Sequence, residues 1–147
     1  MNKIKSNISI KEVKEASKEI YNAMIELLSQ LTSSELAFSQ KDLERIVASN
    51  SSILFTALDE TLNNKIVGIL TLAIIDIPTG MLAKIEDVVV DKSCRGQKLG
   101  ETIVESLKDI ARQKNCYKVI LQSSSKNLRF YEKAGFKKRD YQLEYKY

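Results

Sequence analysis

The feature of this sequence that most limits its fold is a long apolar run at residues 66–75, IVGILTLAII, which is rich in β-branched side chains. Such a run is typical of a strand. The polar turn ETLNNK at 60–65 separates it from another strand-like stretch, SILFTAL at 52–58, so we expect these two strands to form an antiparallel hairpin. After the turn IPTG, residues 81–90 end in three consecutive valines at 88–90. A central strand buried on both faces is therefore predicted here.

Three amphipathic helices are predicted before and after these strands. In the first, apolar residues recur at three- and four-residue spacing, at Ile20, Met24, Leu27, Leu28 and Leu31. The second begins near Ser39, which forms a capping-box-like pair with Asp42 ahead of another apolar stripe. The third follows the segment 91–100 and has one apolar face, made of Leu99, Ile103, Leu107 and Ile110.

Shorter elements complete the pattern. Strands are predicted at 6–11 and 117–121, and a short helix at 127–134 is closed by Gly135, which suits a left-handed residue after a helix. A last strand is predicted at 136–145. The chain of 147 residues is long enough for one domain with one core, and too short for two. We therefore expect one mixed α/β domain over residues 1–147.

Histidine is absent from the sequence, which excludes every mechanism that needs a histidine base. Acid–base chemistry is left to Asp, Glu, Tyr, Lys, Cys, water or the backbone. The two cysteines, Cys94 and Cys116, have no metal-ligand spacing and no histidine partners, so no metal site is expected.

The net charge of +4 arises from 23 basic and 19 acidic residues. The basic residues are scattered among acids without interleaved aromatic side chains, which favours a small anionic ligand over nucleic acid. Runs of about eighteen apolar residues, as a membrane span needs, are missing, and the first residues contain charges throughout. We expect no membrane partner and a cytoplasmic location.

The segment RGQKLG, Arg95–Gly100, joins the valine-rich strand to the third helix. Its two glycines allow a tight turn before the helix, whose first N–H groups and positive dipole end then attract an anion. A phosphate or pyrophosphate suits this site, and Arg95 adds a full charge. By spacing alone, an ordinary strand–helix turn remains an equal alternative.

Two further sets of residues could contribute chemistry. Glu86 and Asp87 are adjacent carboxylates in an apolar strand and point to opposite faces, so they form either a paired structural charge or a site for amine binding or base catalysis. In NLRFYEKAGF, 127–136, we expect Leu128 and Phe130 to pack inward. Tyr131 is then either a tyrosine at the core edge or, in a chain without histidine, a neutral proton donor.

Taken together, these motifs resemble the GNAT superfamily of acetyltransferases. IEDVVVD resembles its fourth strand, RGQKLG is similar to its pyrophosphate motif Q/R-x-x-G-x-G/A, and NLRFYEKAGF resembles its signature N-x-x-F-Y-x-K-x-G-F. The resemblance implies a single-domain α/β fold, with a mixed, mostly antiparallel twisted sheet of six or seven strands flanked by about four helices. It also implies acetyl-CoA as cosubstrate. Lys98 departs from the motif's middle glycine, and would cost about 1–2 kcal/mol if that position required a positive φ.

Within the superfamily, the glucosamine 6-phosphate N-acetyltransferases are the most similar. LLSQLT, IEDVVVD, NCYKVIL and KNLRFYEKAGF resemble their sequences in the same order. The sequence departs from that family at Ala83-Lys84, where Gly-His is usual, and at Gln122, where Asp is usual. This resemblance implies a phosphorylated amino sugar as substrate, a place in UDP-GlcNAc synthesis, and a homodimer with an active site shared between subunits.

The resemblance assigns roles to individual residues. Acetyl-CoA would lie in a splay between the strands at 81–90 and 118–121, bound by the backbone of Val88, Val89 and Val90. The segment Arg95, Gly96, Gln97, Lys98, Leu99 and Gly100 would bind the pyrophosphate, assisted by Asn127 and Lys133. Tyr131 would protonate the leaving thiolate. Substrate binding would use Glu86, Asp87, Thr32 and Gln122. Glu86, or a backbone carbonyl near Gln122, would receive the amine proton through water.

Two alternatives to this assignment remain open from the sequence. One is a GNAT enzyme acting on another amine, such as a protein N-terminus, a lysine, a polyamine or an aromatic amine. The other is a catalytically idle module that binds acetyl-CoA. The presence of Asn127 and Tyr131 disfavours the idle module, whereas Lys98 favours it slightly.

Overall fold

A twisted five-stranded sheet organises the computed structural model, which describes residues 7–31, 35–96 and 98–147. Its strands lie in chain order: β1 (Ile8–Glu12), β2 (Ser52–Asp59), β3 (Lys65–Ile77), β4 (Gly80–Val90) and β5 (Lys118–Leu121). The first four are antiparallel to their neighbours, and β5 is parallel to β4. The predicted 52–58/66–75 hairpin is confirmed, with Ser52 opposite Ala73 and Asp59 opposite Lys65.

In the part of the chain that the structure describes, four helices flank this sheet: α1 (Lys18–Leu28), α2 (Gln40–Val47), α3 (Leu99–Gln113) and α4 (Leu128–Lys133). The same residues include three single-turn 3₁₀ segments: η1 (Glu60–Leu62), η2 (Lys92–Cys94) and η3 (Ser125–Asn127). The predicted capping box starts α2, since Ser39 N–H donates to Asp42 Oδ2 and Asp42 N–H donates to Ser39 Oγ. No helix in the described ranges is both long and apolar enough to cross a bilayer.

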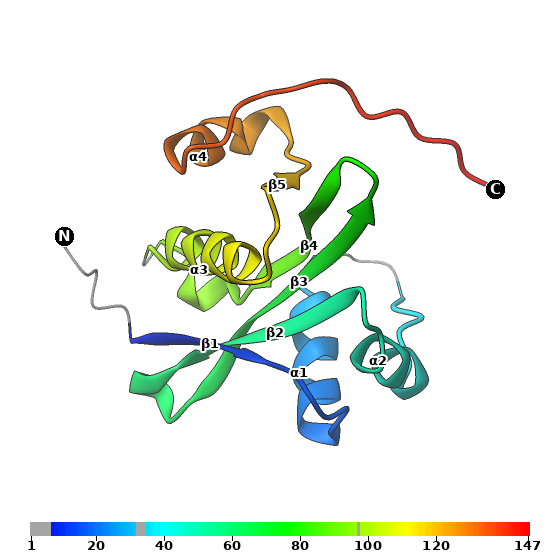
Figure 1. Cartoon of the computed structure of the whole chain (residues 1–147). Helices are drawn as coiled ribbons and strands as arrows, with labels where there is room; N and C mark the ends of the chain where they lie inside the picture. Colours follow the sequence, from blue (N-terminus) through cyan, green and yellow to red (C-terminus); the bar gives the residue numbers. More distant parts are fainter. Residues whose placement is uncertain (1–6, 32–34, 97) are drawn as a thin grey trace.

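Apolar side chains fill a layer on each face of the sheet, and Figure 1 shows α1 and α2 on one side with α3 on the other. On the α3 side, Ile103 and Leu107 pack against β3 and β4, and both are fully buried. On the α1 side, Leu27 and Leu43 pack against Ile69 and Val89. Val88 and Val90, although only half-buried, contact the α3 layer. The predicted apolar contacts on both faces of β4 are therefore confirmed.

The predicted last strand at 136–145 is wrong for the single chain. After α4 the chain runs over the top of the molecule and away from it (Figure 1), without strand pairing. Its alternating apolar side chains are almost fully exposed, at Tyr141 88%, Leu143 93% and Tyr145 83%. A strand forms only where a sheet edge accepts its backbone, and the period-two pattern does not reveal whether such an edge is available. The described sheet accordingly has five strands, not six or seven.

Candidate functional site

The edge of β4 opens where its pairing with β5 stops. The last paired residues are Ile85 and Leu121, and β5 ends there, whereas β4 continues to Val90. The β5-facing edge of β4 from Glu86 to Val90 therefore has no strand partner in the described structure. Glu86 and Gln122, the next residues on each side, flank the start of this opening. This opening lies between the two strands where the resemblance places acetyl-CoA.

A β-bulge bends β4 at this opening. Thr71 pairs with Glu86 and Ile69 pairs with Val89, so Asp87 and Val88 together lie opposite the single residue Leu70. Asp87 has a φ of +43°, a left-handed conformation that aspartate adopts more readily than most residues. Because the bulge interrupts the alternation of side chains, the simple prediction that Glu86 and Asp87 point to opposite faces does not apply here.

Glu86 forms an ion pair with Lys84 on the same strand. Lys84 Nζ lies 2.6 Å from Glu86 Oε1, and the two side chains are 27% and 40% exposed. Glu86 is thus neither an unpaired buried carboxylate nor fully solvated. Its second oxygen, Oε2, has no hydrogen-bond partner among the described residues and remains available to a ligand. Asp87 is exposed.

A hydrogen-bonded turn follows β4 and leads to α3. The Asp91 carboxylate accepts hydrogen bonds from the N–H and hydroxyl of Ser93, both at 2.9 Å. These bonds hold the pKa of Asp91 below its usual value, the backbone bond being the larger cause. Gln30, just beyond α1, accepts from the Lys92 N–H at 2.9 Å. The turn that precedes the predicted pyrophosphate segment is therefore held by Asp91, at the end of β4, and by Gln30.

Two residues of RGQKLG have left-handed backbones, Gly96 at φ +87° and Lys98 at φ +58°. Gly96 makes the predicted tight turn. Lys98 satisfies the condition under which a lysine at this position is costly, because a side chain in this conformation is strained. It is the N-cap residue of α3 and supplies no side-chain cap.

The start of α3 is open to an anion. The first helical hydrogen bond is Thr102 N–H to Lys98 carbonyl, at 3.1 Å, so the N–H groups of residues 99–101 have no partner within the helix. Leu99 is buried, and its side chain anchors the turn in the α3 layer of the core. Arg95 is exposed beside this turn. The geometry matches an anion site at a helix N-terminus.

Gly100 lies within α3 and makes room for α4. A Cβ atom added there would come within 3.3 Å of Phe130 Cζ. The prediction that Gly100 serves the turn is therefore wrong, since its backbone is helical and the small size is what matters. Phe130, predicted to pack inward, is 39% exposed, because it lies over the surface of α3 at this glycine. This contact places the predicted pyrophosphate segment beside the helix that contains Tyr131.

Tyr131 is half-buried between two aromatic rings. Its ring makes edge-on contacts with Phe130, at 5.1 Å between centroids, and with Phe136, at 5.9 Å. Burial raises the pKa of its hydroxyl above the usual 10.0. Tyr131 is thus protonated at neutral pH and able to donate a proton, which fits the predicted role. The predicted helix end is confirmed, with Gly135 at φ +93°.

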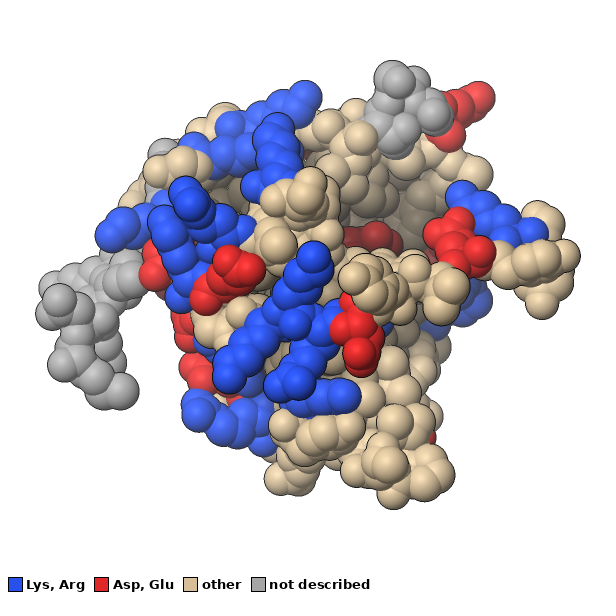
Figure 2. All heavy atoms as spheres, turned by 90° about the horizontal axis from the view of Figure 1, so that it is seen from above, with Lys and Arg blue, Asp and Glu red and all other residues tan. Residues whose placement is uncertain are grey.

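Basic side chains gather on the face that contains α4. Seen from above, Lys and Arg cover much of this face beside a hollow (Figure 2). Six exposed basic residues come from η3, α4 and the segment that follows: Lys126, Arg129, Lys133, Lys137, Lys138 and Arg139. The resulting positive potential favours phosphate groups over neutral ligands.

The other predicted site residues are less constrained. Gln122, Asn127 and Lys133 are exposed, and the Asn127 side chain does not cap α4. Thr32 and Gln97 lie outside the described residues.

Within the described ranges, no group of three or more His, Cys, Asp or Glu side chains could hold a metal ion. A separate open hollow between β1 and α1, lined by Lys11, Glu12 and Lys14 among others, contains none of the predicted residues.

Sequence reasoning missed several residues that shape the site. The Asp-x-Ser pattern at 91–93 is typical of a side-chain turn and could have identified Asp91. The bulge at Asp87 leaves no clear sequence signal. Gln30 and Lys108, whose contacts join distant segments, also could not be found, because both look like ordinary polar residues on or beside a helix.

Comparison with known proteins identifies the family of this chain. The acetyltransferase (GNAT) family model matches residues 18–136. Among curated proteins, glucosamine 6-phosphate N-acetyltransferase from Trypanosoma brucei brucei is 56% identical over 59 residues, which is 40% of each chain. A probable glucosamine 6-phosphate N-acetyltransferase from Drosophila melanogaster is 31% identical over 117 residues, 76% of this chain and 53% of that protein. The first match spans about 40% of the curated relative's length.

A solved structure matches over nearly the whole chain. Glucosamine-6-phosphate N-acetyltransferase from Arabidopsis thaliana superposes with a TM-score of 0.78 at 31% identity, covering 95% of this chain and 98% of that one. The fold, the open β4 edge, the N-terminus of α3 and the family match all lead to the same assignment. The chain belongs to the acetyltransferase (GNAT) family.

Proposed function

We propose that this protein transfers the acetyl group of acetyl-CoA to the amine of glucosamine 6-phosphate, giving N-acetylglucosamine 6-phosphate. The observation that supports this most is the open edge of β4 beyond Ile85, followed after one turn by the start of α3, whose first N–H groups have no partner within the helix. A cytoplasmic location and a role in UDP-GlcNAc synthesis form part of the same proposal.

Acetyl-CoA binding uses mainly backbone groups. The free edge at Val88–Val90 offers N–H groups to the pantetheine arm and to the thioester carbonyl, whose oxygen gains charge during the reaction. The N–H groups at the start of α3 bind the pyrophosphate. Arg95 and the basic residues around α4 supply the cations that a ligand with several phosphates needs.

Transfer occurs by direct attack within a ternary complex. The neutral amine nitrogen attacks the thioester carbon and the C–S bond breaks, so that no acetyl-enzyme forms. Tyr131 donates its phenolic proton to the leaving CoA thiolate and regains a proton from solvent. The proton lost by the amine passes to Glu86 Oε2 or to water. Holding the two reactants together accounts for most of the acceleration.

A phosphorylated amino sugar fits the charges around the opening. An amine beside electron-withdrawing sugar carbons loses its proton more easily than a lysine does, so a carboxylate already paired with Lys84 is a sufficient base. The substrate phosphate requires a cation, and Lys84, Lys126, Arg129 and Lys133 are the candidates. The relatives named above act on this substrate by name, which supports the choice.

We also propose that the active form is a homodimer. The segment after α4 has the period-two pattern of a strand, yet its apolar residues Tyr141, Leu143 and Tyr145 are exposed. Among the described residues, β5 pairs only with β4, so its other edge is open to a second copy of the chain. Pairing between copies would bury these side chains, and we expect Tyr141→Ser/Leu143→Ser/Tyr145→Ser to elute as a monomer where the unchanged chain is a dimer. A monomeric unchanged chain at micromolar concentration would contradict this.

The function is tested by release of free CoA thiol from acetyl-CoA. Four amines are compared: glucosamine 6-phosphate, glucosamine, a lysine peptide and spermidine. Rapid turnover with glucosamine 6-phosphate and slow turnover with glucosamine are expected, because only the former carries the phosphate. Turnover with a different amine alone would remove the sugar assignment and keep acetyl transfer. Acetyl-CoA binding without turnover for any amine would favour a binding module.

A further inference from the structure

Helix α4 is weakly attached to the rest of the protein although it contains Tyr131. It has six residues, and none of them is fully buried. A short helix on the surface is only marginally stable by itself. A proton donor, however, has to stay within hydrogen-bond reach of the leaving group. Some contact must therefore hold the end of α4 that follows Tyr131.

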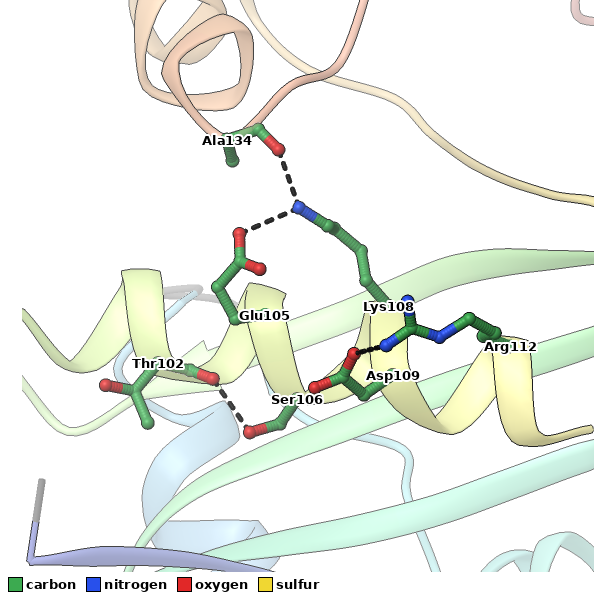
Figure 3. Close-up of polar contacts among 7 residues, drawn as sticks. All are labelled: Thr102, Glu105, Ser106, Lys108, Asp109, Arg112 and Ala134. Carbon is green, nitrogen blue, oxygen red and sulfur yellow. Dashed lines mark hydrogen bonds and ion pairs between the residues drawn. The ribbon is translucent and has the colours of Figure 1, made fainter. Parts of the chain in front are cut away.

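Lys108 of α3 makes that contact. Its Nζ donates to the Ala134 carbonyl, at the C-cap of α4, at 2.7 Å, and also lies 2.8 Å from Glu105 Oε1 (Figure 3). Among the side-chain hydrogen bonds of the described residues, this one alone joins α3 to the end of α4. The Lys108 side chain is only 33% exposed.

The held carbonyl lies one turn beyond Tyr131, and backbone bonds connect the two. Tyr131 carbonyl accepts from the N–H of Ala134 and from the N–H of Phe136, both at 3.0 Å. The Phe136 ring then packs edge-on against Tyr131. Displacement of this turn therefore displaces both the backbone and the ring that surround the tyrosine.

Helix α4 has a second contact with α3, at the start of that helix. Phe130 lies over Gly100, two turns before Lys108. Together, the two contacts fix both the position and the direction of α4. The carbonyls at the end of a helix have no partner within it and bear partial negative charge, so a lysine is well suited to this position.

We propose that Lys108 is a positioning residue for Tyr131: its ammonium, oriented by Glu105, clamps the last turn of α4 onto α3 and so keeps the phenol in place for proton donation. This inference rests on the proposed role of Tyr131. Lys108 touches neither substrate in this account and acts through α4.

The same helix offers a matched control. Arg112 forms an ion pair with Asp109, also three residues earlier, but this pair lies on exposed surface and does not reach α4 (Figure 3). Lys108→Met keeps the aliphatic stem and removes the donor, whereas Lys108→Arg keeps a charged donor. Arg112→Met removes an ion pair of the same spacing without touching the clamp.

The kinetic test separates positioning from general stability. Since a misplacement of about 1 Å can cost about 10²-fold in rate, we expect Lys108→Met to lower kcat about 10-fold with little change in KM for acetyl-CoA. Lys108→Arg should recover most of kcat, and Arg112→Met should leave it unchanged. In a Tyr131→Phe background, Lys108→Met should lower kcat by less than about twofold, since both substitutions act on the same proton donation. If Lys108→Met lowers kcat by the same factor in the presence and in the absence of Tyr131, the proposal is overturned.

Amide hydrogen exchange provides a readout that does not depend on catalysis. Lys108→Met should accelerate exchange at Ala134 and Phe136 relative to Arg112→Met, with exchange in the middle of α3 unchanged. Equal exchange in the two variants would overturn the clamp even if the enzyme is active, whereas failure of the unchanged protein to turn over would count against the proposed function instead. If Lys108→Met does not fold, Glu105→Gln replaces it in both experiments, because it removes only the charge that orients the Lys108 ammonium.

Discussion

Replacing Lys98 by glycine should stabilise the protein while weakening its hold on acetyl-CoA. Lys98 has a φ of +58°, and a left-handed backbone costs a residue with a Cβ about 1–2 kcal/mol. Glycine removes this cost, but it also increases the conformational entropy of the unfolded chain, which destabilises the folded state by about 0.4–1 kcal/mol. With the middle of each range, about 1.5 and about 0.7 kcal/mol, the net stabilisation is about 0.8 kcal/mol, or roughly 2–3 °C in Tm for a domain of this size.

The effect on acetyl-CoA has the opposite sign. Lys98 is the exposed N-cap residue of α3, where we propose that the pyrophosphate binds, and an exposed charge pair contributes about 0.2–1 kcal/mol. Lys98→Gly should therefore raise Kd for acetyl-CoA up to about fivefold, and less at high salt.

Urea unfolding and calorimetric titration measure the two effects, and Lys98→Ala separates their causes. Alanine removes the ammonium but keeps the Cβ, so it should weaken acetyl-CoA binding as glycine does without the gain in stability. A Lys98→Gly variant no more stable than the unchanged protein, or an alanine variant equally stabilised, would refute the argument from backbone strain.

Three further predictions follow from the site. Tyr131→Phe should fold normally and bind acetyl-CoA, yet lose about 10²–10⁴ in kcat; near-normal turnover would remove Tyr131 from the mechanism. Gly100→Leu should displace Phe130 and lower kcat about 10-fold, with α3 retained by circular dichroism; unchanged kcat would show that α4 tolerates the shift. Because the pKa of Asp91 is lowered, its ionised form stabilises the fold above the unfolded pKa near 3.8, and this stability is lost as the pH falls through the lower folded value. Asp91→Asn should thus be less stable by about 1 kcal/mol at pH 6, and the urea midpoints of the two proteins should converge as the pH falls below 3.8.

Much of the fold could be predicted because local and long-range preferences agree. The apolar runs that form β3 and β4 contact an apolar layer on each face of the sheet, and the stripe of α3 faces the sheet as its periodicity requires. At the site, the motif's glycine at the position of Lys98 suggests a positive φ, and Lys98 has a positive φ in the structure.

The errors lie where a neighbour decides the outcome. Leu31 continues the apolar spacing of α1 but is 56% exposed, because the helix ends at Leu28. The sequence does not show that Phe130 and Gly100 are neighbours, and the packing of α4 over α3 explains both residues. The segment from 136 has the pattern of a strand without a sheet edge in its own chain. For Glu86 the sequence leaves open whether the carboxylate is paired, and only the structure identifies Lys84 as its partner.

The central claim is direct transfer of acetyl from acetyl-CoA to an amino sugar phosphate. Mass spectrometry of the protein and the small molecules, after incubation with deuterium-labelled acetyl-CoA and glucosamine 6-phosphate, tests it most directly. We predict that the label appears on the sugar nitrogen and that the mass of the protein stays unchanged, with or without the sugar. Label on the protein before the sugar is added, or none on the sugar after many expected turnovers, would contradict the account.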